Sequence, residues 1–309
     1  MVPLSLRIDL LFECNIGAMM KLENILIQKI QLFQENEITE YHIYNILSKK
    51  IKSKENKKIL RQIANDELEH YEVWKKYSQK EVKPNRFKIL FFYWISRILG
   101  LTFGIKLMER GEEDAQDHYA EFEGKIDEID DIIEDEEKHE NRLIEFLDEE
   151  HLQYVGSIVL GLNDALVELT GALAGLTLAL QQTQLIALSG MITGIAAALS
   201  MGASEYLSTK EEETERHPLR ASIYTGGTYL VTVFVLILPY LLFSNYYLCL
   251  GLTLLLAIVI IGLFNYYISV VKDETFRHRF IEMTALSLSI ALISFLIGFF
   301  IRRFMGVEI

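Results

Sequence analysis

Five long apolar segments in the second part of this sequence limit its possible folds more than any other feature. A helix needs about 20 residues to cross a hydrocarbon layer of roughly 30 Å, and each segment is about that long. They are residues 154–180, 185–207, 222–243, 246–271 and 281–301. Because a bilayer core offers the backbone no hydrogen-bond partners, such segments are expected as α-helices. The sequence therefore predicts a five-helix membrane domain over residues 153–309.

The first part of the chain is rich in charge, so it is expected to fold separately from the apolar part. The formal net charge of the whole sequence is -13, which argues against a nucleic-acid partner because phosphate binding needs clustered Lys and Arg. Residues 109–150 alone contain 20 Asp or Glu against four Lys or Arg, a balance that suits cations. The two cysteines, Cys14 and Cys249, indicate neither a disulfide framework nor a thiolate metal site.

The apolar periodicity of the charged part indicates four helices. We expect them at residues 22–52, 55–77, 109–125 and 127–152. Residues 1–20 contain only a short apolar run that charged side chains interrupt, so we expect them to be poorly ordered, with Met20 as an alternative first residue. The soluble domain is therefore expected over residues 21–152, and the fold class of the whole chain is expected to be all-α.

One segment between the second and third of these helices differs in composition from both the charged helices and the membrane spans. Residues 87–107 are apolar and aromatic, yet they contain Arg97 and Lys106. A central Arg in a membrane span costs roughly 2.5 to 3.5 kcal/mol on insertion scales. We therefore expect an interfacial helix that lies on the membrane lipid, with a buried core helix as the alternative.

Two copies of a Glu-x-x-His motif stand in the second and fourth helices of the charged part. They are Glu67 with His70 and Glu136 with His139. The spacing of three residues puts a carboxylate and an imidazole on one helix face, where both can reach the same metal ion. A single copy would be a weak signal, because charged helix faces match such a pattern by chance.

Each motif follows a helix that carries a Glu with a Tyr seven residues later. The first pair is Glu37 with Tyr44, and the second is Glu112 with Tyr119. The resulting order of Glu, Glu-x-x-His, Glu and Glu-x-x-His is the ligand set of a di-iron carboxylate site in a four-helix bundle. Two copies in the right order argue against a chance match.

The charged part therefore resembles the ferritin-like superfamily, and most closely its rubrerythrin-type domains. The resemblance implies a ferritin-like four-helix bundle with the ligands Glu37, Glu67, His70, Glu112, Glu136 and His139. Bound iron would be Fe2+ or Fe3+, and Mn2+ is an alternative because O and N ligands accept both metals. Glu40 and Glu109, one turn away, are either further ligands or solvated carboxylates. Nothing resembles the four-cysteine rubredoxin module of full rubrerythrins, so electron transfer by that route is not expected.

The first apolar span carries two acids and two glycines at helical spacing. They are Asp164, Glu168, Gly171 and Gly175. Ionisable residues inside a span are costly and functional by default, and Gly-x-x-x-Gly lets helices approach closely. We expect the first spans of two subunits to meet along this stripe and to line a cation path with carboxylates. A polar contact between helices of one chain is the alternative.

The second span ends in a stretch with Met201 and Glu205 one turn apart. Thioether sulfur favours softer metals and carboxylate accepts hard ones, so the pair suits ferrous iron better than Mg2+ or Ca2+. A membrane methionine that only packs is the alternative. The stretch from Ser200 to Tyr206, and the Gly-x-x-Asp ending at Asp164, resemble those of the vacuolar iron transporter family.

This second resemblance covers roughly residues 150–309 and implies a homodimeric, proton-coupled exporter of Fe2+ or Mn2+. Asp164, Met201 and Glu205 would be pathway residues, and Glu168 is added from the stripe. Some members carry a Glu-rich metal-binding insert between spans two and three, whereas the loop here is short. Its acids Glu211, Glu212 and Glu215 would form a reduced version at the cytoplasmic mouth. The fusion as a whole resembles the bacterial membrane-bound ferritins.

The loops between spans predict the orientation in the membrane. Loops after spans two and four carry Lys and Arg, whereas loops after spans one and three carry no charge. Positive charge marks the cytoplasmic side, so the soluble domain is expected in the cytoplasm and the C-terminus outside the cell membrane. Arg302 and Arg303 lie on the wrong side for this rule.

The leading hypothesis is an iron exporter whose cytoplasmic domain senses, buffers or oxidises the metal. Protons and iron would compete for the same carboxylates, which gives antiport a physical basis. A second hypothesis is a membrane-anchored di-iron peroxidase or oxidase of the rubrerythrin type. A third is a manganese exporter that uses the soluble site as a sensor. The sequence leaves open whether the soluble domain has ferroxidase or peroxidase activity.

Overall fold

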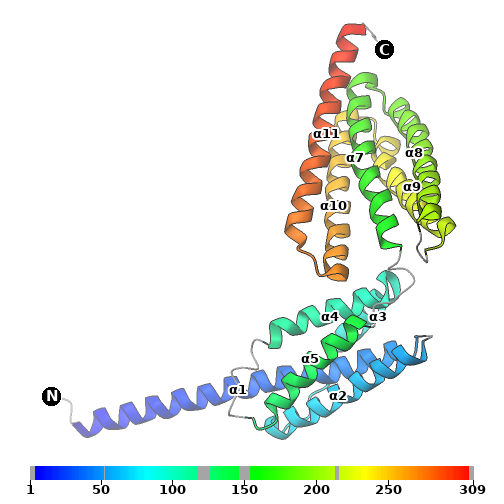
Figure 1. Ribbon diagram of the computed structural model, residues 1–309. Helices are drawn as coiled ribbons and strands as arrows, with labels where there is room; N and C mark the ends of the chain where they lie inside the picture. Colours follow the sequence, from blue (N-terminus) through cyan, green and yellow to red (C-terminus); the bar gives the residue numbers. More distant parts are fainter. Residues whose placement is uncertain (1–3, 52, 117–125, 146–153, 213–215, 306–309) are drawn as a thin grey trace. The chain divides into compact units, whose positions relative to one another are not determined.

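The computed structural model describes residues 4–51, 53–116, 126–145, 154–212 and 216–305 (Figure 1). Ten helices and no strand lie within these ranges, as an all-α chain requires. The chain divides into two compact units, Met1–Leu147 and Asp148–Ile309. The two units are described in turn.

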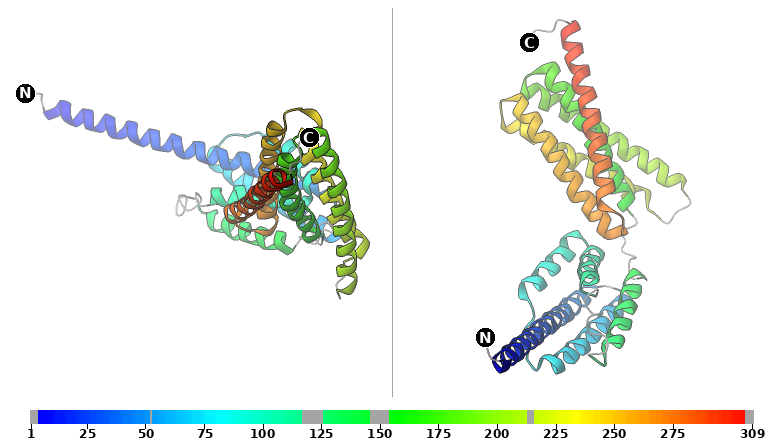
Figure 2. Two further views of the ribbon diagram at one scale, coloured as in Figure 1. Left: turned by 90° about the horizontal axis from the view of Figure 1, so that it is seen from above. Right: turned by 90° about the vertical axis from the view of Figure 1, so that its left-hand side faces the viewer.

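Two long helices form the frame of the first unit. α1 (Leu4–Ser48) and α2 (Lys54–Ser78) are joined by a short turn and lie side by side in each view (Figures 1 and 2). The Ser53 side chain caps α2 by accepting a hydrogen bond from the Asn56 backbone N–H. Residues 4–20 are part of α1. A helix that is already nucleated gains one hydrogen bond for each residue added, so the packed part of α1 supports its extension.

The segment expected as one interfacial helix is two helices in the structure. α3 (Arg86–Leu99) ends at Gly100, whose φ of 100° favours glycine, and α4 (Leu101–Gln116) begins directly after it. The third bundle helix therefore starts at Leu101 and not at residue 109. The sequence did not indicate the break, because apolar residues continue through it. α3 packs on α1 and α4.

α5 (Ile129–Glu145) completes the first unit and contacts α2 and α4. Helices α1, α2, α4 and α5 fit a ferritin-like bundle, which confirms the expected fold class. Two buried apolar clusters fill it. One consists of Ile30, Phe33, Trp74, Ile126, Ile129 and Ile132. The other consists of Ile43, Tyr44, Leu47, Leu60, Ile63, Ala64, Ile105, Met108 and Leu143.

The predicted ligands fall between these two clusters on each helix that contributes to both. On α1, Glu37 follows Phe33 and precedes Ile43. On α5, the second Glu-x-x-His motif likewise lies between Ile132 and Leu143. Apolar packing above and below thus holds a polar layer inside the bundle.

Five helices make up the second unit. They are α7 (Val155–Leu180), α8 (Thr183–Glu211), α9 (Pro218–Leu242), α10 (Tyr246–Lys272) and α11 (Phe276–Met305). Each is long and apolar enough to cross a membrane, which confirms the five predicted spans. α7 contacts all four of the others, and its buried side chains form the centre of this unit (Figures 1 and 2).

Candidate metal centre

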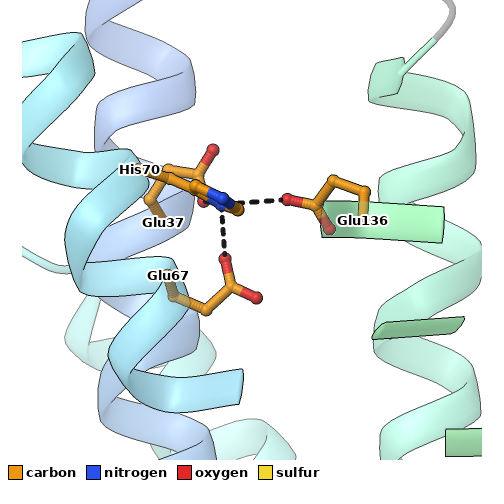
Figure 3. Close-up of side chains that lie close together, drawn as sticks. All are labelled: Glu37, Glu67, His70 and Glu136. Atoms are coloured by element: carbon orange, nitrogen blue, oxygen red, sulfur yellow. Dashed lines mark ion pairs between the residues drawn. The ribbon is translucent and has the colours of Figure 1, made fainter. Parts of the chain in front are cut away.

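Three helices of the first unit bring four predicted ligands together. Glu37 comes from α1, Glu67 and His70 come from α2, and Glu136 comes from α5 (Figure 3). One ligand atom from each lies within 4.8 Å of the others. His70 Nδ1 is 3.3 Å from Glu136 Oε1, 3.6 Å from Glu37 Oε2 and 3.7 Å from Glu67 Oε2. The four side chains are buried.

The second predicted histidine faces the same two central carboxylates. His139 Nδ1 lies 3.3 Å from Glu67 Oε1 and 3.8 Å from Glu136 Oε2. Glu67 and Glu136 thus present one oxygen to His70 and the other oxygen to His139. Glu67 and Glu136 could therefore hold a pair of metal ions together with His70 and His139, as in di-iron carboxylate sites.

Several buried atoms of the cluster that could bind a metal ion have no hydrogen-bond partner. Glu67 Oε2, His70 Nδ1 and His139 Nδ1 are buried and make no hydrogen bond. Buried polar atoms of this kind are nearly always satisfied in native proteins. A pair of divalent cations with O and N ligands would satisfy all three, so the donor set fits the metal pair that the motif implies.

Burial and close contact shift the pKa values of the cluster in opposite directions. Burial raises the pKa of the Glu37 and Glu109 carboxyls to about 8. Burial also opposes ionisation of Glu67, but the close contacts with the imidazoles of His139 and His70 outweigh it and hold the pKa of that carboxyl below its usual range. Burial would lower the pKa of the His139 imidazole, but the close contacts with Glu136 and Glu67 outweigh it and raise that pKa to about 11. Without a bound cation, protons therefore balance the carboxylate charge.

The carboxylates one turn from the predicted ligands also belong to this region. Tyr44 of α1 donates a hydrogen bond to Glu109 of α4, which joins the two helices beside the cluster. Burial, together with the charges of Glu67, Glu37 and other cluster carboxylates, raises the pKa of Glu40. Among the described side chains, Glu109 is therefore the α4 acid at the centre. The side chain of Glu112 and the whole of Tyr119 lie outside the described residues.

Sequence reasoning missed two aspartates that hold the imidazoles. Asp66 Oδ2 of α2 is 3.0 Å from His139 Nε2 of α5, and Asp135 Oδ2 of α5 is 3.8 Å from His70 Nε2 of α2. Each motif helix thus supplies an acid to the histidine of the other. The signal was present, since both copies read Asp-Glu-x-x-His.

A third missed residue orients a carboxylate from the apolar side. Trp74 Nε1 donates a hydrogen bond of 2.9 Å to Glu37 Oε1. Sequence spacing gave no signal for Trp74, because a tryptophan at an apolar helix position is expected simply as a core residue.

An acidic pocket lies on the outer side of His70. Its volume is about 330 Å³, and it lies between α2 and α5. It is lined by Glu69, His70, Val73, Glu128, Asp131, Ile132, Glu134, Asp135 and Lys138. Lys138 pairs with Glu134 and Asp135 at 3.1 and 3.0 Å. Lys76 pairs with Glu128 at 2.6 Å, and the further acids Glu69 and Asp131 favour cations at this approach to the cluster.

Two of the predicted pathway acids in the second unit accept hydrogen bonds from neighbouring helices. Glu205 of α8 is buried and accepts a hydrogen bond of 2.6 Å from Ser157 Oγ of α7. Glu168 of α7 is exposed in the single chain and accepts a hydrogen bond of 2.9 Å from Tyr229 of α9. Met201 is partly buried against the apolar core of this unit.

Asp164 lies in a pocket of about 430 Å³ on the surface of α7. Gly156, Val159, Leu160, Asn163, Asp164, Val167 and Leu286 line it. Leu286 belongs to α11, so the pocket lies where these two helices separate. The Asn163 Oδ1 atom is buried without a hydrogen-bond partner and adds a second polar group beside Asp164.

The two glycines of the predicted stripe contact α11 of the same chain. A Cβ at Gly171 would lie 2.9 Å from Ile290 Cγ2, and one at Gly175 would lie 3.0 Å from Ser294 O. A Cβ at Gly298 would lie 2.3 Å from Gly175 O. The expectation that these glycines approach a second subunit is therefore corrected, because α11 already occupies that surface.

The acids expected at the mouth of the pathway lie at the end of α8. Glu211 and Glu212 are exposed, and Glu212 forms an ion pair with Arg216. Glu215 lies outside the described residues. The structure does not bring these acids together with Asp164 or Glu168 through any described contact.

Comparison with known proteins agrees with both parts of the fold. Residues 34–147 match the family described as Rubrerythrin, and residues 155–217 match the family described as the VIT family. No curated protein matches the chain. The chain is therefore a rubrerythrin or ferritin-like domain fused to a VIT-type membrane domain.

Each match indicates a coarse function for its part of the chain. The Rubrerythrin match and the buried Glu and His cluster fit a di-iron type of metal site. The VIT match and the five apolar helices indicate a membrane protein that transports metal ions.

Proposed function

We propose that this protein exports ferrous iron, or Mn2+ as the alternative cargo, from the cytoplasm in exchange for protons. The observation that carries the proposal is that α7 and α8 keep Asp164, Glu168 and Glu205 within membrane-spanning segments. Such residues are costly in a bilayer and are retained for a function. An anchor that only tethers the soluble domain has no use for them.

Carboxylates on the pathway give exchange its physical basis. A carboxylate binds either a proton or a divalent cation, so protons that arrive from outside would displace iron. Glu205, held by Ser157, and Met201 one turn earlier offer hard and soft donors from α8. This combination supports a borderline metal such as Fe2+.

The proposed direction follows from the charge of the loops. The ends of α8 to α11 and the loops between α8 and α9 and between α10 and α11 carry Lys210, Arg216, Arg220, Lys272, Arg277 and Arg279. Positive loops lie on the cytoplasmic side, which puts the soluble domain there and the C-terminus outside the cell membrane. Arg302 and Arg303, in the last turn of α11, oppose the rule, but the first spans usually dominate the orientation.

A homodimer through the first span is part of the proposal. Glu168 is exposed on the surface of the single chain, within a segment that spans the membrane. Its hydrogen bond from Tyr229 satisfies only part of the carboxylate. A second copy that covers Asp164 and Glu168 would remove both acids from lipid, so these acids rather than the glycines would lie at the dimer axis.

The soluble domain would sense, buffer or oxidise iron on the cytoplasmic side. The cluster found among the described residues would hold one metal pair in each chain, which is too little for bulk storage of iron mineral. Bridging carboxylates at Glu67 and Glu136 suit a pair of metal ions of either oxidation state.

Flux into proteoliposomes tests the export proposal. Wild type, Asp164→Asn and the control Glu274→Gln are reconstituted with an iron-sensitive dye inside, and Fe2+ is added outside with a reductant and a pH gradient. Glu274 is a matched control because it lies in the loop after α10 and pairs with Arg279. We expect flux that needs the gradient, at least about tenfold slower in Asp164→Asn and unchanged in the control. Equal flux in all three would contradict the proposal.

A membrane-anchored peroxidase or oxidase is the second candidate function. The observation in its favour is the Tyr44 hydroxyl bonded to Glu109 beside a buried di-metal cluster, an arrangement suited to redox chemistry. Replacing Asp164 with Asn and Glu168 with Gln together separates the two functions. Peroxide turnover should persist under the enzyme proposal, and iron flux should be lost under the transporter proposal.

A further inference from the structure

Helix α3 has a wide apolar face that no other described part of the first unit covers. Its exposed apolar side chains are Phe87, Leu90, Phe91, Trp94, Ile98 and Leu99. They recur at the period of a helix and line one open groove of about 400 Å³. Phe87 is 78% exposed and Ile98 is 72% exposed. Contiguous apolar patches of this kind mark interaction sites.

The other face of α3 is already used within the bundle. Ile89 and Phe92 pack against the apolar cluster that contains Tyr44 and Leu60, and Ser96 is buried. The Asn85 side chain caps the helix by accepting from Phe87 N and Lys88 N. α3 is therefore a fixed part of the bundle that presents its second apolar face outward.

The charge around this face is opposite in sign to the net charge of the whole chain. Residues 82–108 contain no Asp or Glu, whereas the whole chain has a net charge of -13. The same segment holds the basic residues Lys83, Arg86, Lys88, Arg97 and Lys106. Arg86 and Arg97 are exposed at the two ends of α3. A local excess of positive charge beside exposed apolar side chains complements an anionic surface.

We propose that α3 lies in the headgroup region of the membrane that holds the second unit, with its apolar face toward the acyl chains. The chain is itself a membrane protein, so a bilayer is always present. Aromatic side chains such as Trp94 and Tyr93 favour the membrane–water interface. Basic side chains at the edge of an apolar helix face add attraction to anionic lipids.

The lipid contact would act on the helices that carry the metal cluster. α3 packs on α1 and α4, which carry Glu37 and Glu109. This part of the proposal stands whether or not the chain exports iron, because it depends only on α3 and lipid.

The two tryptophans of the chain provide a direct test. Trp74 is 0% exposed and Trp94 is 50% exposed on the apolar face of α3. The full chain is placed in liposomes of phosphatidylcholine and phosphatidylglycerol that carry bromine on the acyl chains. We expect bromine to quench the wild-type emission, and the Trp94→Phe variant, which keeps only Trp74, to be quenched at least about twofold less. Equal quenching of both proteins, or quenching of Trp94 by aqueous iodide but not by bromine, would overturn the proposal.

A second set of variants separates lipid from other partners. Arg86→Gln with Arg97→Gln should reduce the quenching of Trp94 in anionic liposomes, whereas Arg61→Gln on α2, which is also exposed, should not. Omitting phosphatidylglycerol should have the same effect as the paired substitution. If Ile98→Cys forms a disulfide-linked dimer in liposomes while bromine leaves Trp94 unquenched, a second copy covers α3 and the proposal fails.

Discussion

At the scale of single residues, the arrangement of the two aspartates indicates how the imidazoles are oriented. His139 Nε2 contacts Asp66 and His70 Nε2 faces Asp135, so each ring turns its Nδ1 toward the central carboxylates. Carboxylates that hold the outer nitrogen of a ligand histidine fix the tautomer and the ring orientation.

We therefore expect Asp66→Asn to weaken metal binding by about 10- to 100-fold, the range typical for such partners. Titration of the metal-free protein with Mn2+ or Co2+ measures the affinity. Glu72→Gln is the matched control, because Glu72 is an exposed acid of the same helix that pairs only with Lys75 among the described residues. Asp66→Asn with the affinity of wild type would show that the aspartate does not orient the ligand.

The pKa values of the cluster predict that metal binding releases protons. The pKa of the Glu37 and Glu109 carboxyls is about 8 and that of His139 is about 11, so these groups hold protons at pH 7 in the metal-free protein. Ligands must lose these protons to bind a cation. The affinity should therefore fall as pH falls from 8 to 6, by about tenfold per pH unit for each proton released. Calorimetry in buffers of different ionisation enthalpy measures the release, and an affinity that is constant over this range would contradict the prediction.

Most of the metal cluster was predictable from sequence because helical spacing fixes which side chains share a face. Glu37 and both Glu-x-x-His motifs follow from that rule, whereas the spacing left Glu109 open as either a further ligand or a solvated carboxylate. Trp74 does not, because its hydrogen bond depends on how α2 packs against α1, and no periodicity encodes that contact.

At the scale of helices, close packing of α7 on α11 depends on glycine. A Cβ at Gly298 would lie 2.3 Å from Gly175 O, closer than atoms can approach, so Gly298→Ala must separate the two helices. We expect a loss of about 1 to 3 kcal/mol, as for other overpacked sites. Thermal unfolding in detergent measures it. Gly251→Ala in α10 is the matched control, since nothing lies within 4 Å of its Cβ position. Equal melting temperatures for the two variants would contradict this packing.

Helix existence was predictable from length and apolar content, but one helix boundary and one packing partner were not. All five spans agree with the structure, because a run of about 20 apolar residues has few alternatives. The division between α3 and α4 was missed because apolar residues continue through Gly100, and only its positive φ separates them. The glycine stripe of α7 was assigned to another subunit because sequence cannot tell which helix approaches a small residue.

At the scale of the whole molecule, each unit has its own buried core, so their functions should separate by substitution. Effects of distant sites that share no contacts are usually additive. Glu67→Gln removes a bridging carboxylate of the first unit, and Asp164→Asn removes an acid of the second. If the proposed export is correct, each substitution should leave the other unit's property intact.

We therefore expect Asp164→Asn to keep the metal content of the soluble domain while it loses flux. Glu67→Gln should lose that metal and keep flux at saturating Fe2+, because the path through α7 and α8 is unchanged. At limiting Fe2+ its flux should fall if the soluble domain buffers iron for the pathway, since the local supply is then lost. Metal content by elemental analysis and flux at two Fe2+ concentrations distinguish these cases. Loss of flux at saturating Fe2+ in Glu67→Gln would instead mean that the bundle gates the membrane unit, and would contradict independent action.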